Sequence, residues 1–134
     1  MRRLAAILTC LAIAGCVPAA SQRSQAVEPG TTITLAPGQL ATARGSPLSV
    51  RFVAVTEDSR CPRATTCIWA GEVRASIEIR EGKQQPLQVE LKPGGSADAG
   101  DFRVSLIGVE PYPAADRKIV AQDYRATLKI DATR

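Results

Sequence analysis

Two cysteines and the chain's only tryptophan lie close together in EDSRCPRATTCIWAGEV, residues 57–73. Five residues separate Cys61 from Cys67, which is enough chain to turn back and bring the two Cα atoms within disulfide range. A thioredoxin-type redox pair has only two intervening residues, and two cysteines alone do not fill a tetrahedral zinc shell. A structural disulfide is therefore predicted, with a redox-active pair or a thiolate metal site as the alternatives.

The same stretch carries charged side chains that could bind or react. Hard carboxylate oxygens suit calcium, but the acids lack the spacing of a calcium loop. Two acids can also share the acid and base roles in glycoside cleavage, which makes a hydrolase the less favoured alternative. The candidate binding loop, which would recognise a partner or a small ligand, consists of Glu57, Asp58, Arg60, Arg63, Trp69 and Glu72.

The chain contains no histidine, so the common Ser-His and Cys-His catalytic arrangements are excluded. No catalytic residue, metal site or cofactor is predicted. The favoured class is a non-enzymatic protein that binds another component or plays a structural part.

The first residues indicate export. Met1-Arg2-Arg3 supplies positive charge, and an apolar run too short to span a bilayer follows. Its end, Ile13-Ala14-Gly15-Cys16, resembles the lipobox of bacterial lipoproteins, in which the chain is cut before a cysteine that then becomes acylated. We therefore predict a signal peptide over 1–15, a lipidated Cys16 followed by a flexible tether over 16–31, and a folded domain over 32–134; ordinary secretion, with cleavage near Ala19-Ala20, is the alternative.

The predicted address is the cell envelope, where the acylated Cys16 would hold the protein to a lipid bilayer. Val17 follows the cysteine. Aspartate at that position is a signal for retention in the inner membrane, so a Gram-negative source would favour the outer membrane, facing the periplasm. An oxidising envelope also favours a bond between Cys61 and Cys67, because Cys10 leaves with the signal peptide and Cys16 is committed to lipid.

Charge gives no support for a nucleic-acid partner. The formal net charge of +4 falls to +2 once Arg2 and Arg3 leave with the signal peptide. The remaining basic and acidic residues are interspersed, without a basic block or interleaved aromatic residues. The partners expected are the bilayer and, through the loop, an envelope protein.

Alternation of apolar and polar residues predicts strands rather than helices. The clearest segments are 73–80, 87–91 and 124–130, and a fourth at 48–54 has apolar residues on both faces, which favours a central position. Short strands are predicted at 33–35 and 40–43, and another at 102–109 needs a bulge near Gly108. Residues 93–100 are interpreted as a loop.

Seven or eight strands in about 100 residues bury one face of each most economically as two packed sheets. The predicted fold is therefore all-β, an antiparallel β-sandwich with one disulfide-closed loop. The core has few aromatic residues and must be filled mainly by valine, isoleucine, leucine and alanine.

The segments Asp58-Ser59-Arg60-Cys61-Pro62 and Cys67-Ile68-Trp69-Ala70-Gly71 resemble a signature of small bacterial lipoproteins of largely unassigned function. This resemblance implies an all-β lipoprotein and no particular activity. In that group the chain re-enters a strand at the second cysteine, so a strand from Ile68 to Arg80 is expected here.

Two roles within the loop follow from the predicted strand. Trp69 has the inward parity of Cys67 and Val73, so it is expected to pack beside the disulfide, with exposure as a binding anchor as the alternative. Arg60 is expected to pair with Asp58 or Glu72, or to support a loop carbonyl.

Overall fold

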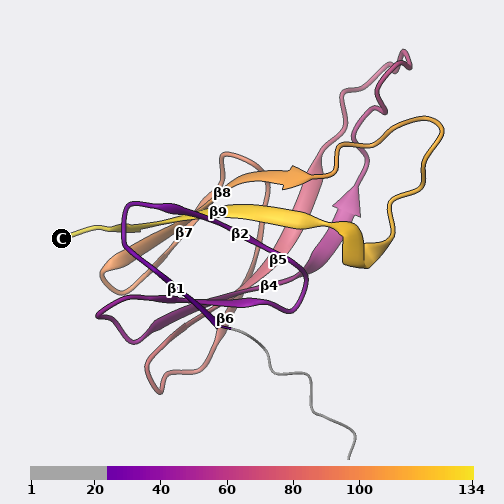
Figure 1. Ribbon diagram of the computed structural model, residues 1–134. Coiled ribbons are helices and arrows are strands. Elements are labelled where there is room, and N and C mark those ends of the chain that lie inside the picture. The colour runs from indigo at the N-terminus through magenta and orange to yellow at the C-terminus, as the bar shows by residue number, and fades with distance from the viewer. Residues whose placement is uncertain (1–23) are drawn as a thin grey trace, which may run out of the picture.

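The computed structural model describes residues 24–134, which fold into nine strands and one short 3-10 helix (Figure 1). The predicted signal peptide and Cys16 lie outside the described residues. Along the chain the elements are β1 (Ser24–Val27), β2 (Thr32–Leu35), β3 (Leu40–Ala43), β4 (Leu48–Asp58), β5 (Val73–Glu81), β6 (Leu87–Leu91), β7 (Ser96–Ala99), β8 (Phe102–Glu110), η1 (Ala121–Asp123) and β9 (Arg125–Ala132).

The strands form two sheets, which confirms the all-β sandwich. One sheet has the order β1-β3-β4-β5-β6 and the other has the order β2-β9-β8-β7. All pairs are antiparallel except that of β1 with β3. β4 lies between β3 and β5, in the central position that its two apolar faces predict.

The core lies between the sheets and is built from the inward residues of each alternating strand. Its largest fully buried side chains include Phe52 from β4, Ile77 and Ile79 from β5, Leu106 from β8, and Leu128 and Ile130 from β9. The predicted bulge is confirmed, because the register between β8 and β9 shifts between Leu106 and Gly108. This shift lets Val109 face the core together with Val104 and Leu106, while Ile107 at the bulge is left 51% exposed.

Three predicted boundaries are wrong. β1 forms inside the predicted tether and pairs with β3, although only Val27 of its four residues is buried. β7 forms inside the predicted loop at 93–100, where alternating small residues give no hydrophobic signal. β5 begins at Val73 rather than Ile68, so five residues expected in a strand belong to a loop.

Candidate functional site

Residues 59–72 connect β4 to β5 and form an arm that projects beyond both sheets, at the upper right of Figure 1. At its base the hairpin ladder continues irregularly: Ser59 N donates to the Glu72 carbonyl at 2.8 Å, and Cys61 N donates to the Ala70 carbonyl at 2.9 Å. The Cys61–Cys67 disulfide closes the outer part, with the Cα atoms 5.9 Å apart. The predicted disulfide is therefore confirmed.

An ion pair lies at the base of the arm, where Asp58 ends β4. Arg60 donates two hydrogen bonds to the carboxylate, from Nε to Oδ1 at 2.7 Å and from Nη2 to Oδ2 at 2.6 Å. Tyr124 donates its hydroxyl to Oδ2 at 2.9 Å. Both charged side chains are only 9% exposed, so this pair is a structural contact and not an open ligand site. We call Asp58, Arg60 and Tyr124 the clamp.

The clamp also fixes the arm to the segment 111–124, which we call the adjoining loop. Arg60 Nη1 donates to the Val109 carbonyl at 2.8 Å, and Nη2 donates to the Pro111 carbonyl at 3.0 Å. The Arg60 guanidinium lies 4.9 Å from the centroid of the Tyr112 ring. Arg60 therefore joins three elements, β4, β8 and the adjoining loop, through one planar group.

Burial and hydrogen bonding act in opposite directions on the Asp58 carboxyl. Burial alone would raise its pKa, but the bonds from Arg60 and Tyr124 and the charge of Arg60 outweigh that effect, so the pKa is lowered. Burial, together with the bond to Asp58, raises the pKa of Tyr124 to about 12. At neutral pH the clamp therefore holds a carboxylate, a guanidinium and a neutral phenol.

This protonation pattern predicts an alkaline limit to stability. The pKa of Tyr124 is higher in the folded chain than the value of about 10 in an unfolded one. The neutral hydroxyl therefore contributes fully to the free energy of unfolding below pH 10, and this contribution is lost as pH rises toward 12. In a phenolate absorbance titration of the Tyr112→Phe variant, the remaining tyrosine should titrate well above the usual range. Adding Asp58→Asn should lower this pKa, and an unchanged titration would contradict the Tyr124–Asp58 bond.

The other two acids of the candidate loop are ion-paired at the surface. Arg74 on β5 donates to Glu72 at 2.7 Å and lies 3.5 Å from Glu57. Lys92 Nζ approaches Glu72 at 3.7 Å, and the bond from Arg74 lowers the pKa of Glu72. Within residues 24–134, no group of three or more histidine, cysteine or acidic side chains could hold a metal ion.

The outer end of the arm faces solvent and carries two exposed large apolar side chains. Ile68 is 92% exposed and Trp69 is 81% exposed, so the predicted packing of Trp69 beside the disulfide is wrong. Alternate residues point to the same face only along a continuous strand. Here the disulfide ring and Gly71, which has a φ of +68°, interrupt the strand. Arg63 donates its backbone N–H to the Pro113 carbonyl at 2.9 Å, and its guanidinium lies 5.3 Å from the Tyr112 ring centroid. We call Ile68 and Trp69 the tip.

Removing the disulfide is predicted to cost stability at the arm. Closing a ring this small removes about 2 to 2.5 kcal/mol of denatured-state entropy in the chain-entropy model. The double variant Cys61→Ser/Cys67→Ser should unfold at a lower urea concentration and retain the β-type far-ultraviolet spectrum, because the core strands lie elsewhere. An unchanged unfolding midpoint would show that the bond does not constrain the chain in solution.

The sequence interpretation missed Tyr124 and the adjoining loop as parts of this site. Tyr124 begins the predicted strand 124–130 and packs against the core, but its hydroxyl also reaches Asp58. In the adjoining loop, Pro111-Tyr112-Pro113 is typical of a turn and does not indicate a contact with Arg60. Nothing local to residues 57–73 indicates that a loop some fifty residues later lies beside the arm.

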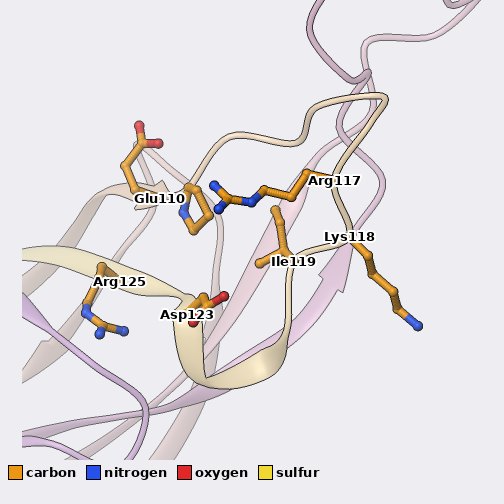
Figure 2. A pocket seen from close by; sticks show the side chains of 7 residues that line it. Glu110, Arg117, Lys118, Ile119, Asp123 and Arg125 are labelled. Carbon is orange, nitrogen blue, oxygen red and sulfur yellow. The ribbon is translucent and has the colours of Figure 1, made fainter.

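Three open hollows lie at or near the clamp. One, of about 500 Å³, is lined by Glu110, Pro111, Arg117, Lys118, Ile119, Asp123 and Arg125. Figure 2 shows its basic and acidic side chains interspersed, with the Lys118 amino group pointing away. A second, of about 300 Å³, lies at the arm's base and includes Arg60, Glu72, Lys92 and Tyr112. The third, of about 240 Å³, is bordered by the three clamp residues together with Arg117 and Ile119. The charged groups of each are of mixed sign, so none favours a ligand of one charge.

The chain was compared with protein families, curated proteins and solved structures, and no family, curated protein or solved structure matches it. Among residues 24–134, no helix has the length and apolar character needed to cross a membrane.

Proposed function

We propose that this protein is a lipid-anchored, non-enzymatic component of the cell envelope that contacts another envelope component through the tip of its arm. The observation that carries this proposal is the exposure of Ile68 and Trp69, at 92% and 81%, on a disulfide-closed arm. Large apolar side chains at the end of a braced projection are costly to leave in water, and aromatic anchors are enriched in contact surfaces.

The state of the carboxylates supports binding over catalysis or cation capture. Asp58 is committed to Arg60 and Tyr124, while Glu57 and Glu72 both lie against Arg74. A carboxyl whose pKa is lowered by an arginine is a poor general acid at neutral pH, and it would have to give up that arginine to ligate a metal ion.

The envelope address rests on the lipobox resemblance at Ile13–Cys16. Replacing Cys16 with serine should move the protein from the membrane fraction to the soluble fraction of fractionated cells, since the acyl chains at that residue would supply most of the attachment. The outer membrane, facing the periplasm, is the proposed location in a Gram-negative source. Unaltered membrane association of the Cys16→Ser chain would contradict the lipid anchor.

Photocrosslinking in intact cells tests the contact surface. A photoreactive amino acid at Trp69 should trap a neighbouring envelope molecule, protein or lipid, because this large side chain is 81% exposed. The same amino acid at Ile107 on β8, which is 51% exposed, is the matched control. Equal yields at the two positions would reject the tip as the contact surface.

A further inference from the structure

Exposed apolar side chains gather at one end of the sandwich. Of the six large hydrophobic side chains that are exposed among residues 24–134, Ile68 and Trp69 belong to the arm, and Tyr112 and Val120 belong to the adjoining loop. The two segments lie side by side (Figure 1), joined by the bond from Arg63 N to the Pro113 carbonyl and by a β-bridge between Arg63 and Ala114. Four of the six exposed large hydrophobic side chains therefore belong to two neighbouring loops at one end of the sandwich.

The charges at this end are of mixed sign, with basic residues in slight excess. Residues 59–71 contain two arginines and no acid, and Arg60 is already paired with Asp58, which leaves Arg63. The adjoining loop adds two bases, Arg117 and Lys118, and two acids, Asp116 and Asp123. Tryptophan and tyrosine are the residues enriched at the boundary between lipid headgroups and hydrocarbon, and nearby basic side chains favour anionic headgroups.

Strand direction places Ser24, where the described residues begin, toward the same end. Ser24 pairs with Leu40, and Leu40 pairs with Arg51. β1 is parallel to β3, and β3 is antiparallel to β4, so β1 begins on the side toward which β4 runs as it enters the arm. The end of β1 that connects to Cys16 along the sequence is therefore the end that faces the side of the arm.

The length of chain between Cys16 and Ser24 is similar to the distance that the arm extends. Eight residue steps from Cys16 to Ser24 span at most about 30 Å when fully extended. Ten residues of nearly extended chain from Arg51 to Cys61, which pairs with Ala70 beside Trp69, rise about 30 Å. An acylated Cys16 would therefore hold the domain no further from the bilayer than the arm extends toward it.

From these observations we infer that the tip docks onto the surface of the bilayer in which Cys16 is anchored, as a second and shallow membrane attachment. This inference rests on the proposed lipid anchor. The anchor keeps the tip at a high effective concentration near the bilayer, so that two apolar side chains and a few basic ones are enough to bind its surface. The arm would then fix the orientation of the sandwich relative to the membrane.

The chain's single tryptophan makes the test direct. The acylated protein, purified from membranes, is reconstituted into phosphatidylethanolamine and phosphatidylglycerol vesicles with and without brominated acyl chains, which quench indole at short range. Trp69 emission should be quenched several-fold more than in the control Trp69→Phe/Leu87→Trp. Leu87 is 48% exposed and begins β6 opposite Ile79, away from the arm. Ile68→Ser should reduce the quenching of Trp69.

Quenching no greater than in the Leu87→Trp control would overturn the inference. A blue shift of Trp69 emission that increases with protein concentration, without quenching by the brominated lipid, would also overturn it. That result would mean that the tip contacts a second copy of the chain. The mass of the purified protein reports acylation separately. An acylated protein with an unquenched Trp69 that still crosslinks to an envelope protein would reject membrane docking and leave the proposed function in place.

Discussion

Replacing Arg60 with alanine is expected to lower the free energy of unfolding by about 2 to 3 kcal/mol, because it leaves a carboxylate buried without its partner. Asp58, whose side chain is 9% exposed in the folded chain, would lose two charge-assisted bonds. The carbonyls of Val109 and Pro111 would lose their donor as well. Urea unfolding at neutral pH, followed by far-ultraviolet circular dichroism, measures this loss.

Two control variants separate the clamp from ordinary surface charge. Arg74→Ala removes a partner of Glu57 and Glu72, but that arginine is 45% exposed, so its effect should be much smaller. Arg60→Lys should recover only part of the loss, since an ammonium cannot grip a carboxylate at two points and reach two carbonyls. Similar unfolding midpoints for Arg60→Ala and Arg74→Ala would contradict a structural clamp.

Replacing Gly71 with alanine should disrupt the base of the arm more severely. A Cβ at this position would clash with the carbonyl oxygen and carbon of Ser59, so the backbone must move. The residue also has a φ of +68°, which alone costs a side-chain-bearing residue about 1 kcal/mol. Movement here would break the ladder bond from Ser59 N to the Glu72 carbonyl. We expect a total loss of about 3 kcal/mol, measured by urea unfolding.

Gly38 supplies the matched control. Its φ is +81°, but nothing lies within 4 Å of an added Cβ, so Gly38→Ala tests the conformational cost without the clash. Gly71→Ala should therefore unfold at a clearly lower urea concentration than Gly38→Ala. Equal midpoints would mean that the close approach of Gly71 to Ser59 does not exist in solution.

Much of the sandwich could be predicted because burial imposes period two on each long strand. β4, β5 and β8 follow the alternation, and the conflicting registers of β8 indicated the bulge at Gly108. β7 escaped prediction because its sequence, Ser-Ala-Asp-Ala, offers only small apolar groups, although pairing with β8 satisfies its backbone.

The candidate site was predicted only in part. Arg60 was expected to pair with Asp58 or Glu72, or to support a loop carbonyl, and the pairing with Asp58, only two residues away, is present. The carbonyls that Arg60 contacts belong to Val109 and Pro111, which are 49 and 51 residues away, and no local pattern indicates them. Tyr124 is 66 residues from Asp58, and only the topology brings it there. The placement of Trp69 failed because strand parity was extended through a disulfide ring and a glycine of positive φ that end the alternation.

The proposed role of the arm depends most on the exposure of Trp69, and the fluorescence of this tryptophan measures that exposure directly. In the dilute, unacylated Cys16→Ser chain without lipid, the emission maximum should lie close to that of free tryptophan in water and be readily quenched by acrylamide. Every signal comes from this residue, because the chain has one tryptophan. A blue-shifted maximum with weak quenching would place Trp69 against the sandwich, and the arm would then have no apolar tip to present.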